Sequence, residues 1–149
     1  SQISMTTHVR QRGTIRTLMS ALYEAMTPGD EVIIPAPYWV SYPDMTLLAA
    51  GVPVVVECQE ENDFKITAAE LEAAITPKTK WVVLNSPSNP TGAAYSRAEL
   101  RAIADVLLKH ENVWVMSDDM YEHLVYDDFE FTTIAQVEPK LKSRTLTCN

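Results

Sequence analysis

The chain has 149 residues, 46% of them hydrophobic, and a formal net charge of −8 at pH 7. This length suffices for one domain with a buried core, and the hydrophobic share excludes a disordered chain. The negative charge argues against a general binder of nucleic acid or acidic membranes, and no stretch approaches the roughly 20 apolar residues that span a bilayer.

Helical and extended patterns alternate along the chain. Apolar residues at helical spacing predict a helix over 15–26, and a β-branched run predicts a strand over 31–35. A second helix is expected over 38–50, ended by Gly51, and is followed by a strand over 53–57. The capping boxes Thr67-Ala68-Ala69-Glu70 and Ser96-Arg97-Ala98-Glu99 predict two more helices, the second reaching about His110. The remaining strands are expected over 80–84, 113–116 and 144–147.

Most of these strands are apolar on both faces. Such runs are typical of parallel strands that are covered by helices on both sides. Because strands and helices alternate, the sequence predicts a doubly wound α/β sheet. No linker and no second domain is evident.

Three polar loops follow predicted strands, and ligands bind at such strand ends in open α/β folds. They contain Trp39, Asn89 and the pair Asp118 and Tyr121. Each residue also has a purely structural explanation. Taken alone, Trp39 is better explained by core packing, Asn89 by a turn before proline, and Asp118 by a helix N-cap, and Tyr121 on the same face could be plain packing. The presence of all three groups in order favours a site.

Several familiar sites are absent from the sequence. It contains no G-x-G-x-x-G, no P-loop and no G-x-S-x-G element. Cys58 and Cys148 show no metal-ligand spacing, and the three histidines are scattered, so no metal site is predicted. Two reduced thiols and an N-terminus without the apolar core of a signal peptide predict a cytoplasmic protein.

Three stretches resemble one family. They are DEVIIPAPYWVSYPDM (30–45), LNSPSNPTGAAYSRAEL (84–100) and SDDMYEHLVYD (117–127). Together they are similar to the large domain of bacterial aspartate aminotransferases, fold-type I enzymes that use pyridoxal 5′-phosphate (PLP). The resemblance implies a three-layer αβα domain with a mostly parallel sheet. The resemblance runs from about Thr27 to Asn149. We therefore assign residues 1–149 to an incomplete PLP-binding large domain, in which residues 1–12 are not placed.

The resemblance also implies cofactor-binding roles. Asp118 matches the aspartate at the pyridine nitrogen, where a carboxylate keeps that nitrogen protonated. Asn89 and Tyr121 match the residues that hydrogen-bond the 3′-oxygen, and Trp39 matches the aromatic that stacks on the ring. Gly13 and Thr14 stand where the family has a Gly-rich, phosphate-binding turn, although their neighbours depart from the usual pattern.

The family's Schiff-base lysine follows the last strand within a few residues, beyond Asn149. Lys140 and Lys142 precede that strand in a charged, surface-like segment and do not match it. We therefore assign no catalytic residue. We expect the 149-residue chain alone to be inactive, because this lysine supplies both covalent attachment and proton transfer.

The resemblance implies amino-acid and 2-oxo-acid substrates, namely aspartate and 2-oxoglutarate, and a homodimer or other self-association. Two alternatives stay open. One is another fold-type I enzyme, such as a C–S lyase or an aminocyclopropane-carboxylate synthase. The other is a non-catalytic relic that only binds a ligand or a partner.

Overall fold

The computed structural model describes residues 20, 22–38, 40–85, 94–118 and 132–148. Its strands are β1 (Glu31–Ala36), β2 (Val52–Glu57), β3 (Thr79–Asn85), β4 (Trp114–Asp118) and β5 (Thr145–Cys148). They form one five-stranded sheet in the order β2-β1-β3-β4-β5. Every neighbouring pair is parallel, as the doubly apolar runs predicted.

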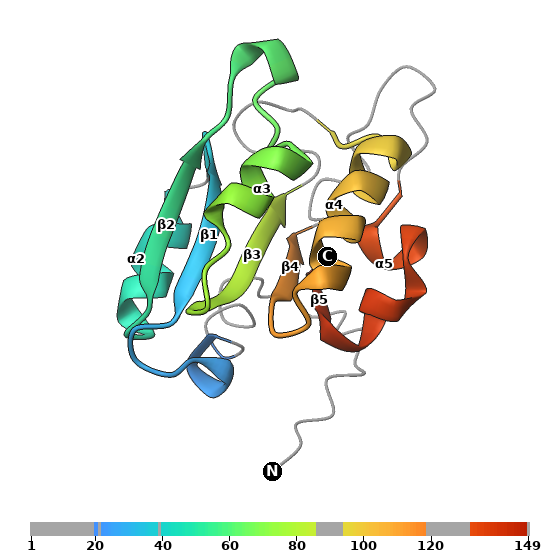
Figure 1. Cartoon of the computed structure of the whole chain (residues 1–149). Helices are drawn as coiled ribbons and strands as arrows, with labels where there is room; N and C mark the ends of the chain where they lie inside the picture. The colour runs from blue at the N-terminus through green and yellow to red at the C-terminus, as the bar shows by residue number, and fades with distance from the viewer. Residues whose placement is uncertain (1–19, 21, 39, 86–93, 119–131, 149) are drawn as a thin grey trace.

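Helices cover both faces of this sheet, which gives the predicted three layers (Figure 1). Helices α3 (Ala68–Ala74) and α4 (Arg97–Lys109) lie on one face, and α2 (Ser41–Leu48) lies on the other. The shorter α5 (Ile134–Val137) packs beside α4, and the 3-10 turns η1 (Glu60–Asn62) and η3 (Pro139–Arg144) join strands to helices. Within the described part of the chain, no helix is long and apolar enough to cross a bilayer.

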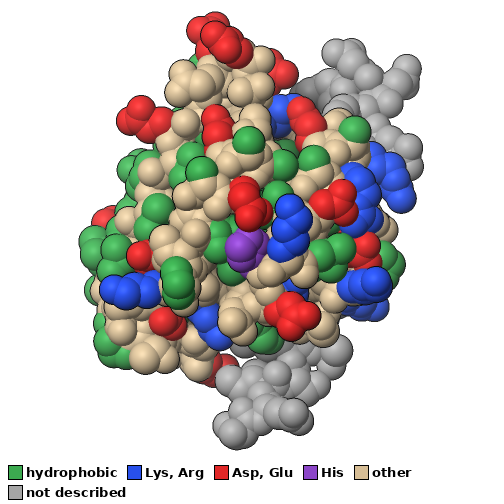
Figure 2. All heavy atoms as spheres, in the orientation of Figure 1, with side chains coloured by type: hydrophobic (Ala, Val, Ile, Leu, Met, Phe, Trp, Pro, Cys, Tyr) green, Lys and Arg blue, Asp and Glu red, His purple; other side chains and the backbone are tan. Residues whose placement is uncertain are grey.

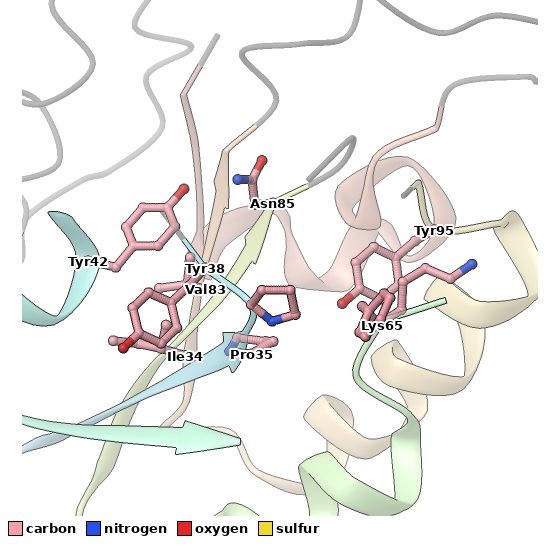
Figure 3. A pocket seen from close by; sticks show the side chains of 10 residues that line it. Ile34, Pro35, Tyr38, Tyr42, Lys65, Val83, Asn85 and Tyr95 are labelled. Carbon is pink, nitrogen blue, oxygen red and sulfur yellow. The ribbon is translucent and has the colours of Figure 1, made fainter. Parts of the chain in front are cut away.

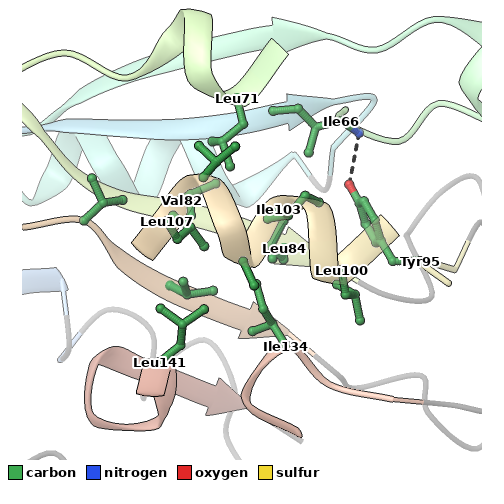
Figure 4. Close-up of a cluster of buried hydrophobic side chains, with 14 of the residues drawn as sticks. Ile66, Leu71, Val82, Leu84, Tyr95, Leu100, Ile103, Leu107, Ile134 and Leu141 are labelled. Carbon is green, nitrogen blue, oxygen red and sulfur yellow. Dashed lines mark hydrogen bonds between the residues drawn. The ribbon is translucent and has the colours of Figure 1, made fainter. Parts of the chain in front are cut away.

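The two faces of the sheet enclose separate hydrophobic clusters. The larger lies under α3, α4 and α5 and includes the fully buried Leu71, Leu107 and Leu141 (Figure 4). The smaller lies under α2 and includes Tyr42 and Trp81. Because β-strand side chains alternate between faces, β3 supplies Val82 and Leu84 to one cluster and Trp81 and Val83 to the other.

Both predicted capping boxes are present. The side chains of Thr67 and Ser96 accept hydrogen bonds from the backbone N–H groups of Glu70 and Glu99, whose carboxylates accept in return. Between β4 and β5 the sequence analysis predicted no helix, yet Thr133 and Gln136 form a third capping box at α5. The Thr-x-x-Gln pattern was a usable signal for it.

Most predicted strands shift by a residue at one or both ends, and two elements differ more clearly from their predicted bounds. The helix expected over 38–50 runs only over Ser41–Leu48, because Ala50 adopts a left-handed backbone with φ 61° and turns the chain. Gly51 follows at a point where a side chain would collide with Met26. Strand β4 extends to Asp118, so Ser117 and Asp118 lie in the strand and not in the loop after it.

The described surface of α3 and α4 carries interspersed charges of both signs (Figure 2). Its ion pairs include Arg101 with Asp105 and with Glu138, and the His110 ring lies within hydrogen-bond distance of the Glu72 carboxylate. Lys140 and Lys142 are exposed, as predicted for their segment. The predicted loop at Asn62-Asp63 is exposed as well.

Candidate functional site

The carboxyl ends of β3 and β4 bring two polar side chains together. Asn85 is the last residue of β3, Asp118 is the last residue of β4, and the parallel register pairs them directly. Sheet pairing alone therefore places an amide beside a carboxylate, although 33 positions separate these residues in the sequence. This is the edge at which open α/β sheets bind ligands.

Asp118 is a buried carboxylate with a firm partner. It is 3% exposed, and one of its oxygens, Oδ2, accepts a hydrogen bond of 2.5 Å from the hydroxyl of Tyr42. Tyr42 is also 3% exposed. It lies in the first turn of α2, in the helical layer that packs on the sheet. This hydrogen bond therefore joins α2 to the end of β4.

A pocket opens beside this pair, at the ends of β1 and β3. The connections that follow β1 and β3 run in opposite directions here, because β1 leads to β2 on one side and β3 leads to β4 on the other. Figure 3 shows Tyr38 and Tyr42 on one side of the pocket, Lys65 and Tyr95 on the other, and Asn85 at the tip of β3. The full lining is Ile34, Pro35, Pro37, Tyr38, Tyr42, Phe64, Lys65, Val83, Asn85 and Tyr95.

Asn85 leaves one acceptor of the pocket unsatisfied. Its Oδ1 is buried and has no hydrogen-bond partner among the described residues. A buried acceptor without a partner carries a free-energy cost that a bound donor would remove. The Asn85 amide therefore offers a ligand an unsatisfied acceptor, and the sheet register pairs Asn85 with the buried Asp118.

On the side of the pocket opposite Tyr42, the lining residues Lys65 and Tyr95 make polar contacts of their own. The Lys65 ammonium donates to the carbonyl of Ala94 at 3.1 Å and lies 2.9 Å from the Glu99 carboxylate. The Tyr95 hydroxyl accepts from the backbone N–H of Ile66 at 3.1 Å, and burial raises the pKa of this phenol. Burial alone would raise the pKa of Glu99, but hydrogen bonds from Lys65 and Ser96 leave it below its usual range.

Cys58 is a buried thiol in the larger hydrophobic cluster, which also contains Tyr95. Burial raises the pKa of Cys58 to about 11, helped by the nearby charge of Glu70. A thiolate is the reactive form of cysteine, so this thiol is protonated and inert at neutral pH.

Of the predicted cofactor-binding residues, the structure describes Asp118. The others lie outside the described residues, and their roles stay predictions: Trp39, Asn89, Tyr121, Gly13 and Thr14. The alternative role of Asp118 as a helix N-cap also concerns residues that are not described.

Two residues of the site, Tyr42 and Asn85, were not among the predicted site residues. For Tyr42 a partial signal existed, because a buried tyrosine hydroxyl usually has a hydrogen-bond partner. Helical spacing places Tyr42 on the same face as the buried Met45. For Asn85 the signal was its position directly after the apolar run that ends at Leu84.

Residues 13–149 match the family model described as aminotransferase class I and II. The chain is 66% identical over 137 residues to the aspartate/prephenate aminotransferase of Cereibacter sphaeroides, an alignment that covers 92% of this chain and 34% of that protein. The crystal structure of the aspartate aminotransferase from Rhizobium meliloti superposes with a TM-score of 0.89 at 56% identity, covering 91% of this chain and 34% of that one. The structure of the Thermus thermophilus aspartate aminotransferase with maleate superposes with a TM-score of 0.82 at 42% identity, covering 91% of this chain and 34% of that one. The chain thus spans about a third of the length of the curated relatives it matches.

Proposed function

The chain belongs to the class I and II aminotransferases, a family that uses PLP, and from this premise we propose that it forms the cofactor-binding part of an aspartate aminotransferase. The observation that carries the proposal is the buried carboxylate of Asp118 at the carboxyl end of β4. We propose that the complete enzyme moves an amino group between aspartate and 2-oxoglutarate.

The residues present fit PLP. A buried carboxylate suits a cationic ring nitrogen, because opposite charge favours the charged form of both groups. The unsatisfied Oδ1 of Asn85 lies beside it, at the same end of the sheet. Asp118 would hold a proton on the pyridine nitrogen, and PLP, when bound, supplies an electron sink for the carbanion at the α-carbon of the substrate.

The other roles follow from the resemblance. Asn89 and Tyr121 would hydrogen-bond the 3′-oxygen, Trp39 would stack on the ring, and Gly13 and Thr14 would contact the phosphate. No lysine of the chain is assigned the covalent role. We therefore propose that the 149-residue chain binds PLP without covalent attachment and does not turn over substrate by itself.

A second candidate for the amino acceptor comes from the Cereibacter relative, whose name includes prephenate. Prephenate, like 2-oxoglutarate, carries a 2-oxo-acid group. The names of the relatives give no support to a C–S lyase or an aminocyclopropane-carboxylate synthase. We further propose that the enzyme is a cytoplasmic homodimer. The exposed apolar side chains Val40, Leu47 and Leu48 of the α2 region support self-association.

A chimera tests the proposed activity. Residues 13–149 would replace the aligned segment of the Rhizobium meliloti enzyme, to which they are 56% identical. We expect the chimera to bind PLP and to form glutamate from aspartate and 2-oxoglutarate. Asp118→Asn in the chimera should reduce kcat, whereas Asp105→Asn, at an exposed position of α4, should not. A chimera that folds and binds PLP but transfers no amino group to 2-oxoglutarate or prephenate would contradict the proposal.

A further inference from the structure

The bond between Tyr42 and Asp118 joins two layers of the domain at the proposed site. The donor lies in α2, the acceptor lies at the end of β4, and 76 positions separate them. Both side chains are 3% exposed, so water does not compete for this contact. No role of Tyr42 follows from the motifs of the sequence.

We propose that Tyr42 is a positioning residue for Asp118, whose hydroxyl keeps that carboxylate ionised and turned toward the cofactor ring. This inference rests on the proposed function for its consequence, the contact with PLP. Its chemical core, the control of Asp118 by Tyr42, concerns only residues of this chain.

The geometry gives Tyr42 two effects on Asp118. Donation to Oδ2 limits rotation about the Cβ–Cγ bond, and this fixes the direction in which Oδ1 faces. A hydrogen bond to the charged form of an acid also favours that form. Tyr42 therefore opposes the effect of burial, which alone would favour the neutral acid and weaken its attraction to a pyridinium.

Tyr42 is itself held firmly. Its ring belongs to the hydrophobic cluster under α2, with Ile34, Trp81 and Val83. Its backbone carbonyl accepts a hydrogen bond of 2.9 Å from the hydroxyl of Thr46, one turn further along α2. A donor that is fixed by packing can fix its acceptor, as preorganised sites require.

The other groups next to Asp118 can be named from the sheet register. Asn85 on β3 is its direct neighbour and carries no charge, and Cys148 is its register partner on β5. From α2, the titratable group on Asp118 is the Tyr42 phenol. The Tyr42 hydroxyl donates to this carboxylate at 2.5 Å.

The test measures the pKa of Asp118 in the 149-residue chain by carbon-13 NMR of its carboxyl group. We expect Tyr42→Phe to raise this pKa by at least about one unit, because the bond to the ionised form is lost. Tyr95→Phe is the matched control. Like Tyr42→Phe, this change removes one buried tyrosine hydroxyl. The Tyr95 hydroxyl accepts from the backbone N–H of Ile66 and lies in the larger hydrophobic cluster, on the other face of the sheet from Tyr42, so the pKa of Asp118 should stay unchanged.

A second measurement needs no folded Tyr42 variant. The Cζ resonance of Tyr42 in the wild-type chain should titrate together with Asp118, and this titration should vanish in Asp118→Asn. An unchanged pKa of Asp118 in a folded Tyr42→Phe variant, or a Tyr42 resonance that ignores the Asp118 titration, would overturn the proposal.

The cofactor arm uses pyridoxamine 5′-phosphate, which has no aldehyde and cannot react with surface lysines. Tyr42→Phe should weaken its binding by about two- to tenfold, the equivalent of one ordinary hydrogen bond. Equal affinity of wild type and variant overturns the link to the cofactor. Failure of the wild-type chain to bind the probe, together with the predicted pKa change, overturns the proposed function and supports the control of Asp118 by Tyr42.

Discussion

Helices α4 and α2 connect neighbouring strands of the same sheet, but they are built differently. Helix α4 has a capping box at its start and five buried residues. At its end, Arg144 donates to the carbonyl of Leu107 within the helix and to those of His110 and Val113 just after it. Helix α2 has no side-chain cap at Val40, and it exposes Leu47 and Leu48. Its buried residue Tyr42 donates to Asp118.

This difference indicates that the two helices have different roles in the domain. In α4, local sequence preferences and tertiary packing agree, and the helix stabilises the fold. In α2, several local preferences are not met, and the helix places a tyrosine at the candidate site. Local rules are violated most often where a segment serves function, and α2 fits that pattern.

The largest effect should come from the core under α4. Leu107 is 0% exposed, so Leu107→Ala should lower the free energy of unfolding by about 2–5 kcal/mol through lost burial and a cavity. Leu48→Ala on α2 removes the same atoms from a side chain that is 63% exposed, and it should change stability by less than about 0.5 kcal/mol. Urea unfolding of both variants checks this contrast, and equal losses would contradict it.

The next effect concerns the end of α4. The Arg144 guanidinium donates to the carbonyls of Leu107, His110 and Val113 at 2.6 to 2.8 Å, and burial lowers its pKa. Arg144→Met should cost about 1.5–3 kcal/mol, because part-buried carbonyls lose a charged donor. Lys109 is an exposed cation in the last turn of α4. Lys109→Met should lower the free energy of unfolding by less than about 1 kcal/mol. A loss in thermal unfolding that is no larger for Arg144→Met would contradict this assignment.

A smaller effect is expected at the start of α4. Ser96→Ala removes the acceptor for the N–H of Glu99 and should cost about 1 kcal/mol. The converse change on α2, Val40→Ser, should gain less than about 0.5 kcal/mol, because Val40 has helical dihedrals (φ −53°, ψ −22°) that differ from those of a capping residue. A gain at Val40 as large as the loss at Ser96 would contradict the contrast between the two helix starts.

The smallest effect should be seen in the acid pH dependence of stability. The pKa of Glu99 is raised by burial but lowered overall by Lys65 and Ser96. A carboxylate with a lowered folded-state pKa stabilises the fold above its unfolded pKa, and this stabilisation is lost as pH falls through the folded pKa. Because the Glu99 side chain is 43% exposed, solvent screens the interaction. Glu99→Gln should flatten the acid limb of the stability curve, and an unchanged acid limb would show that Glu99 does not contribute.

Much of the fold could be predicted because its determinants are local. The apolar run ending at Leu84 and the capping boxes at Thr67 and Ser96 each act within a few residues. The ends of α2 and β4 were predicted less well. The left-handed turn at Ala50 and the extension of β4 to Asp118 depend on tertiary contacts, such as the pairing of Asp118 with Asn85.

The candidate site divides in the same way. Asp118 was predicted from its motif and from its place after a strand. The bond from Tyr42 could not be predicted, because it needs two segments 76 positions apart to meet across the sheet. The packing of α2 creates that contact, and no local pattern encodes it.

The central claim is that the carboxyl ends of β3 and β4 form the cofactor site. Mapping amide chemical-shift changes on addition of pyridoxamine 5′-phosphate to the 149-residue chain tests it most directly. We predict saturable changes at Asn85, Ser117 and Asp118, and none at Trp81 and Trp114 near the opposite ends of β3 and β4. Changes confined to the opposite ends of the strands, or no saturable change at all, would contradict the claim.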